Sequence, residues 1–234
     1  MASKIFKGDM PELLEKILNH LNNEIYSLYS RATLHKLDLH YSNYGFNTEI
    51  FYLLEYNDQF FSRLQDFSFS LIPDYTENAI ALLKILANHA TNISSLKLEK
   101  VYYNDEPQLL NAITHFIKSQ EQLKQFGLFS GEFFPMETHD IISALKSQKL
   151  SLQEVTFENC NFDAEFETLI DCENLEILRI RFCIDVKILF ANINTLEIIG
   201  CSIDTSYMVQ ILQKSGSLLQ RLKFETTDDE VWKK

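Results

Sequence analysis

Three cysteines that could act as nucleophiles or metal ligands occupy one repeated position of the sequence. The segments LQEVTFENCNF, LEILRIRFCID and INTLEIIGCSI share one spacing of aliphatic residues, and Cys160, Cys183 and Cys201 each fall eight residues after the first of them. Because one recurring local structure explains this position, we interpret these cysteines as small core residues that follow a strand. Cys172 lies in a helix-to-strand return. The sequence has no CxxC motif and no clustered Cys/His spacing, so neither a zinc site nor a disulfide framework is expected.

Catalytic and phosphate-binding motifs are absent from the sequence. GxSxG, HExxH, GxxxxGK[ST] and GxGxxG do not occur. Four of the six histidines fall in helical stretches, where a lone histidine is more often a surface or core residue than a catalytic one: His20, His89, His115 and His139. The net charge of −12 weighs against a nucleic-acid partner, because phosphate binding needs a basic surface. We expect no enzyme, no cofactor, no metal and no nucleic-acid partner.

The repeated segment extends to eight copies of one frame, in which two further apolar residues follow the first at three and five positions. The first positions are spaced by 30, 29, 30, 29, 23, 18 and 26 residues. The frame resembles the leucine-rich-repeat pattern L-x-x-L-x-L-x-x-(N/C). The eight copies are Leu34/Leu37/Leu39, Leu64/Phe67/Phe69, Ile93/Leu96/Leu98, Leu123/Phe126/Leu128, Leu152/Val155/Phe157, Leu175/Leu178/Ile180, Ile193/Leu196/Ile198 and Leu219/Leu222/Phe224.

The frame predicts one strand for each repeat, because apolar residues two apart face the same side of a strand. The stretches 77–90 and 107–123 have apolar residues at helical spacing and are predicted to return the chain as helices. The spacings of 23 and 18 leave room only for a turn or loop. We therefore expect an α/β leucine-rich-repeat solenoid over residues 34–234, with about eight repeats, a curved parallel sheet and the return helices outside.

Residues between the core positions of each strand are predicted to project from the concave face. Arg179, Arg181, Arg221 and Lys223 have acidic neighbours at equivalent positions, so cross-strand charge pairing and a partner-binding patch are both open. The apolar residues on this face suit either an interface with an apolar centre or ordinary surface exposure. The candidate substrate-binding residues are Phe129, Glu154, Glu158, Ile177, Arg179, Arg181, Glu197, Ile199, Arg221 and Lys223, and Lys97 and Glu99 lie on the same face.

The first 33 residues follow a different pattern. Asp9 can cap a helix that has Pro11 in its first turn, and aliphatic residues then form one broad stripe. The segment MPELLEKILNHLNNEIYSLYS resembles the opening of an F-box, and an F-box ahead of leucine-rich repeats is typical of F-box/LRR proteins. This resemblance implies a substrate-recognition subunit of a Skp-cullin-F-box ubiquitin ligase, with repeats that bind the target protein. The residues matching the adaptor-binding motif are Met10, Pro11, Leu13, Leu14, Ile17, Leu18 and Leu21.

The F-box resemblance stops at Ser30. The valine-cysteine-basic stretch and the tryptophan that normally follow are missing, and the chain passes directly into the first repeat. The alternative is therefore a leucine-rich-repeat interaction module without ligase coupling. The start of the chain has no secretion signal and no long apolar run, so we expect a cytoplasmic or nuclear protein without membrane contact. The last repeat is expected to expose an edge unless Val231 and Trp232 fold back as a cap.

Overall fold

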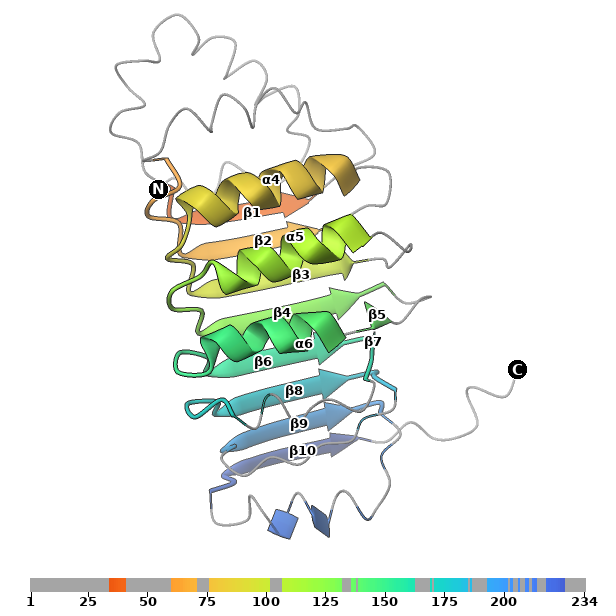
Figure 1. Cartoon of the computed structure of the whole chain (residues 1–234). Helices are drawn as coiled ribbons and strands as arrows, with labels where there is room; N and C mark the ends of the chain where they lie inside the picture. The colour runs from red at the N-terminus through yellow and green to blue at the C-terminus, as the bar shows by residue number, and fades with distance from the viewer. Residues whose placement is uncertain are drawn as a thin grey trace, which may run out of the picture.

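The chain forms one open sheet of eight parallel strands with helices against one face (Figure 1). The sheet follows chain order, β1-β2-β3-β4-β6-β8-β9-β10, and every neighbouring pair is parallel. This computed structural model describes residues 34–40, 60–70, 76–101, 107–131, 136–137, 139–162, 169, 171–184, 186, 193–201, 203, 206, 209–210, 212–213 and 218–225. The predicted α/β class with a parallel sheet is confirmed, and the arrangement is compatible with a solenoid. The predicted segment 1–33 lies outside the described residues.

The strands of the sheet are five to seven residues long. They are β1 (Lys36–His40), β2 (Asp66–Ser70), β3 (Ser95–Val101), β4 (Gln125–Ser130), β6 (Glu154–Glu158), β8 (Ile177–Arg181), β9 (Thr195–Ile199) and β10 (Arg221–Glu225). The other elements are α4 (Thr76–His89), α5 (Pro107–Lys118), α6 (His139–Leu145), the 3-10 helix η4 (Lys146–Gln148), and a two-stranded sheet of β5 (Met136–Glu137) and β7 (Cys160–Asn161).

The register of the sheet aligns the predicted frames row by row. Leu96 pairs with Phe67 and Phe126, and Leu98 pairs with Phe69 and Leu128. The apolar positions of the second to seventh frames are buried throughout, as the alternation predicts. The two end frames differ, because the apolar residues of the first are only partly buried, and Leu222 and Phe224 of the last are exposed. An end strand has a neighbour on one side only, which accounts for this difference.

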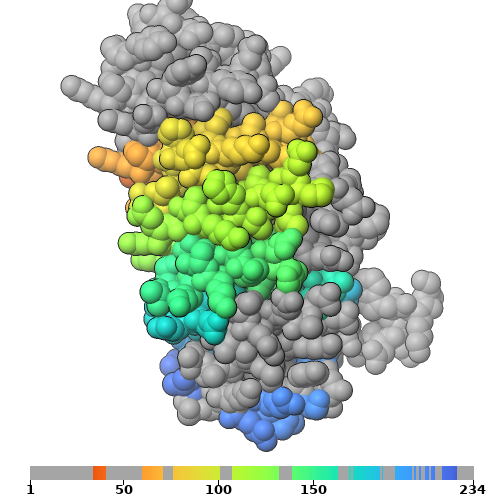
Figure 2. All heavy atoms as spheres, viewed as in Figure 1, coloured from red at the N-terminus to blue at the C-terminus, as the bar shows by residue number. Residues whose placement is uncertain are grey.

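Helices α4, α5 and α6 lie side by side as a layer over the β1–β6 part of one face of the sheet (Figure 1 and Figure 2). Leu82, Leu83 and Leu86 of α4 and Ile113 and Phe116 of α5 are buried in the core. The helices predicted within 77–90 and 107–123 are therefore confirmed. The connections after β6 and β8, where the spacings are short, lie partly outside the described residues. None of the helices in the described part of the chain is long and apolar enough to cross a membrane.

Two buried glutamines join successive repeats on the helical side. The Gln148 side chain accepts a hydrogen bond from Leu123 N at 3.2 Å and donates to the carbonyl oxygens of Gln120 at 2.7 Å and Ile117 at 3.1 Å. Gln120 acts in the same way one repeat earlier, because its Oε1 accepts from Ile93 N at 3.1 Å. Each side chain thus satisfies backbone groups that are buried where a helix ends and the next frame begins.

The cysteines form a second ladder inside the core. All four are buried and free, which confirms their interpretation as core residues. Cys183 Sγ accepts from Cys160 N, and Cys201 Sγ accepts from Cys183 N, both at 3.4 Å. Burial raises the pKa of the Cys172 thiol from 9.0 to about 11, with a smaller contribution from Asp171. Burial also raises the pKa of Cys183, and the Cys183 contact together with burial raises that of Cys201. These thiols are therefore poor nucleophiles.

Candidate functional site

The candidate site lies on the open face, which we define as the face of the main sheet opposite α4, α5 and α6. Parallel pairing arranges its side chains in three rows that cross β6, β8 and β9. The first row has Glu154, Ile177 and Thr195, the second Thr156, Arg179 and Glu197, and the third Glu158, Arg181 and Ile199. Seven of the ten predicted substrate-binding residues thus meet on three neighbouring strands.

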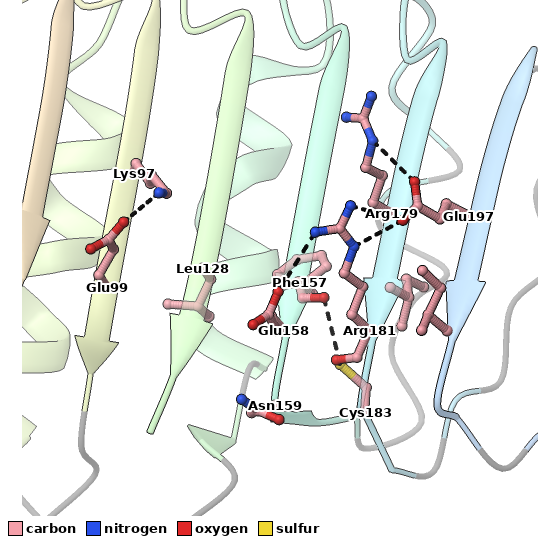
Figure 3. A network of polar contacts seen from close by, with 12 residues as sticks. Lys97, Glu99, Leu128, Phe157, Glu158, Asn159, Arg179, Arg181, Cys183 and Glu197 are labelled. Carbon is pink, nitrogen blue, oxygen red and sulfur yellow. Dashed lines mark hydrogen bonds and ion pairs between the residues drawn. The ribbon is translucent and has the colours of Figure 1, made fainter. Parts of the chain in front are cut away.

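Two arginines and three glutamates form a connected ion-pair network on these strands. Figure 3 shows the part of it that joins Arg179 and Arg181 to Glu158 and Glu197. Arg179 pairs with Glu154 and, through Nε, with Glu197 Oε2 at 3.5 Å. Arg181 donates from Nη2 and Nε to Glu197 Oε1 at 2.8 and 2.9 Å, and its Nη1 lies 3.8 Å from Glu158 Oε2. The predicted cross-strand charge pairing is therefore present, and Glu197 is the shared acceptor.

The network is well ordered for an exposed surface. Its side chains range from 15% exposed for Glu197 to 33% for Arg181, so water screens the pairs only in part. Two donors of one guanidinium converge on the same oxygen, Glu197 Oε1, and fix the orientation of Arg181 as a single contact would not. With two cations against three anions, the cluster is nearly neutral, and its charges already have partners. Covering it with another surface therefore costs less than burying unpaired charges would.

The three apolar residues predicted on this face do not form one cluster. Ile177 and Ile199 are half-buried and lie in the first and third rows, on opposite sides of the ion-pair network. Phe129 is on β4, and its ring lies against Gly127, where an added Cβ would come within 2.7 Å of the ring. The Lys97 ammonium lies 4.7 Å from the centre of the same ring. Phe129 is thus held by its own neighbours.

Three further polar pairs lie within single strands toward the ends of the sheet. Lys97 pairs with Glu99 on the same strand, and His40 Nε2 lies 3.0 Å from Asp38 Oδ1. On β10, Lys223 Nζ lies 3.1 Å from Glu225 Oε1, whereas no ion pair of Arg221 is found among the described residues. Arg221 and Lys223 belong to the exposed edge strand β10, two strands beyond β8. They are therefore peripheral to the network.

The predicted adaptor-binding residues, from Met10 to Leu21, lie outside the described residues, and their role stays a prediction. The described part of the chain also holds no group of three or more His, Cys, Asp or Glu that could bind a metal ion.

Phe182 is a candidate site residue that the strand rows do not predict. It directly follows β8, is 51% exposed and has a φ of +52°. Lys100, Asn159 and Gly200 have the same left-handed φ at the equivalent position, so this conformation belongs to the turn that follows each strand and is unusual at Phe182 only for the size of the side chain. Its ring lies over Gly200, and the exposed Ile184 follows two residues later. A signal was present in the aligned segments, because Phe182 stands where the other two have Asn159 and Gly200.

Comparison with known proteins adds no assignment to this geometry. No protein-family model matches the sequence, and no curated protein matches it significantly.

Proposed function

We propose that this chain is a leucine-rich-repeat protein that binds a partner protein on the open face of β6, β8 and β9, and that it serves as the substrate-recognition subunit of a Skp-cullin-F-box ubiquitin ligase. The observation that carries the binding function is the ordered ion-pair network between Ile177 and Ile199. The in-register rows and the one strand per frame support the leucine-rich-repeat assignment.

The composition of this surface favours a protein partner. Arginines and apolar side chains provide most of the binding energy in protein interfaces, and polar groups around them exclude water. Arg179 and Arg181 are held in place before binding, so little side-chain entropy is lost when a partner covers them. Phe182 and Ile184 extend the apolar area beyond the end of β8, next to Arg181 and Ile199 in the register.

Charge on the open face disfavours nucleic acid as the partner. Extended across all eight strands of the main sheet, the three rows contain six cations and seven carboxylates. The face therefore lacks the excess of basic residues that phosphate binding requires. The cations are Lys36, Lys97, Arg179, Arg181, Arg221 and Lys223, and the carboxylates are Asp38, Asp66, Glu99, Glu154, Glu158, Glu197 and Glu225. The absence of catalytic motifs supports binding, with no enzymatic role for the chain itself.

Coupling to a ligase rests on the F-box-like stripe ahead of β1. The test is co-purification of the full chain with a Skp adaptor and its cullin, compared with a variant in which Leu13, Leu14, Ile17 and Leu18 are replaced by aspartate. Each buried aliphatic residue contributes about 1.5–3 kcal/mol, so the variant is expected to lose the adaptor while the sheet stays folded. Leu150→Asp, at an exposed apolar residue in the turn before β6, is the matched control and should retain it.

The open face is tested in the same experiment with a second variant, Ile177→Lys/Ile199→Lys, which replaces no member of the ion-pair network. This variant should keep the adaptor and lose the partner that the wild-type chain retains. Capture of that partner unchanged by the two lysines would contradict the binding site, because both side chains flank the network.

A second candidate is an interaction module without ligase coupling. It is favoured by the position of β1, which begins at Lys36 and leaves no room for the missing second part of an F-box. A wild-type chain that binds no adaptor at micromolar concentration, but still binds its partner through the open face, would establish this alternative.

A further inference from the structure

The last strand of the described sheet has core-type side chains that are exposed. Leu222 and Phe224 of β10 lie in the same rows as Leu196 and Ile198 of β9. Leu196 is 2% exposed and Ile198 is fully buried, whereas Leu222 and Phe224 are 43% and 39% exposed. The two residues therefore continue the pattern of the core but stand at its edge.

Apolar residues just before β10 enlarge this exposed area. Val209 and Leu212, three residues apart in helical conformation, and Leu218 in the following turn are all exposed. The helical residues of this connection lie at the same end of the molecule as β10 (Figure 1). We refer to these three residues, together with Leu222 and Phe224, as the end surface, and exposed apolar residues at one end of a molecule suit an interaction site. In the described part of the chain, β10 pairs with β9 alone, so its outer edge is also open to backbone pairing.

We propose that a second copy of this chain covers the end surface, with the two β10 strands paired antiparallel about a two-fold axis at Lys223. This proposal is independent of the function proposed above. A two-fold axis makes each edge meet itself, which produces a closed dimer. The two sheets then continue into one another, with the apolar rows of both copies on the same side.

The side chains of β10 are complementary in this register. Directly opposite residues in an antiparallel pair share one face of the sheet. Leu222 of each copy faces Phe224 of the other on the helical side, and Arg221 faces Glu225 on the open face. Lys223 of one copy faces Lys223 of the other, which is unfavourable. Each Lys223 already pairs with Glu225 of its own chain at 3.1 Å. Two apolar contacts and two new opposite-charge contacts thus outweigh one contact between like charges.

The other end of the sheet is a poorer partner for β10. Leu37 and Leu39 of β1 are partly buried, so this edge offers less uncovered apolar surface than β10 does. Pairing of β10 with β1 of another copy would place Arg221 opposite Lys36 in the register of the sheet. It would also be a head-to-tail contact, which builds open filaments unless the rotation closes a ring.

The first test is the mass of the full chain by sedimentation or light scattering between 1 and 100 µM. We expect a concentration-dependent dimer at twice the chain mass of 27.3 kDa. Arg221→Glu replaces two attractive contacts by two repulsive ones and should raise the dimer Kd about tenfold or more. Arg221→Glu/Glu225→Arg should restore association, and Leu150→Glu, remote from β10, should leave it unchanged. The melting temperature verifies that each variant is folded.

The second test fixes the register by cross-linking. Lys223→Cys places a cysteine opposite itself at a Cα separation of about 4.5–5.5 Å, which a disulfide spans. A mild thiol oxidant should link this variant into a covalent dimer much faster than Glu225→Cys, since the four native cysteines are buried. A monomeric wild-type chain at 100 µM, growing filaments, or a dimer insensitive to Arg221→Glu would overturn the proposal. So would a chain that dimerises only after removal of residues 226–234, because its own C-terminal residues would then be the cover.

Discussion

Replacement of Gln148 by methionine tests whether the buried glutamines hold successive repeats together. Methionine has a similar size and shape, so the change removes the hydrogen bonds without opening a large cavity. Two backbone groups lose the only partner that the described residues provide, the N–H of Leu123 and the carbonyl of Gln120. The Ile117 carbonyl still accepts from Gln120 N at 3.3 Å. Both orphaned groups belong to buried residues, since Leu123 is inaccessible and Gln120 is 5% exposed.

The expected loss of stability follows from these two groups. A buried polar group without a partner costs about 1–3 kcal/mol, so Gln148→Met should lower the free energy of unfolding by about 2–6 kcal/mol. For a chain of this size, this corresponds to a fall in melting temperature of roughly 10 °C. The assay is thermal and urea unfolding followed by circular dichroism, with Gln153→Met as the control because that side chain is exposed. If the free energies of unfolding of the two variants differ by less than about 1 kcal/mol, the Gln148 hydrogen bonds between repeats do not stabilise the fold.

Three further predictions concern the turn at Gly200 and the buried thiols. Gly200→Ala should cost at least about 1 kcal/mol in urea unfolding, because φ is +64° and the new Cβ would lie 2.4 Å from Phe182 Cδ1. In the Phe182→Ala background the cost should fall to the backbone strain alone, and equal costs in both backgrounds would refute the contact. The four thiols should not react with a thiol reagent at pH 8 until the chain is unfolded, and rapid native reaction would contradict their burial. The pKa of Cys172 lies near 11 in the folded chain, and its ordinary value is 9.0. Its contribution to stability is therefore fully present below pH 9 and is lost as pH rises toward 11. Cys172→Ala should flatten this decline in the free energy of unfolding.

The sequence by itself determined the eight strands of the main sheet, their inward faces and the helices within 77–90 and 107–123. Alternation along a strand and helical spacing are local properties, so the frame around Leu96 and Leu98 and the helix through Ile113 and Phe116 follow from residue order. The inward position of Cys160, Cys183 and Cys201 also follows, because a residue repeated at one place in a recurring unit has one environment. The same periodicity assigned Arg179 and Arg181 to the open face.

Only the tertiary structure decided which of these side chains meet. Glu197 serves both arginines because β8 and β9 pair in one register, and the irregular spacing of the later frames does not specify that geometry. The Gln148 side chain joins residues of different repeats, because its Nε2 donates to carbonyl oxygens 28 and 31 residues away. Leu222 occupies the repeat position that is buried at Leu196, and Phe182 occupies the position of the smaller Asn159 and Gly200. Their exposure depends on what stacks beside them, and stacking is a property of the assembled sheet that no single repeat encodes.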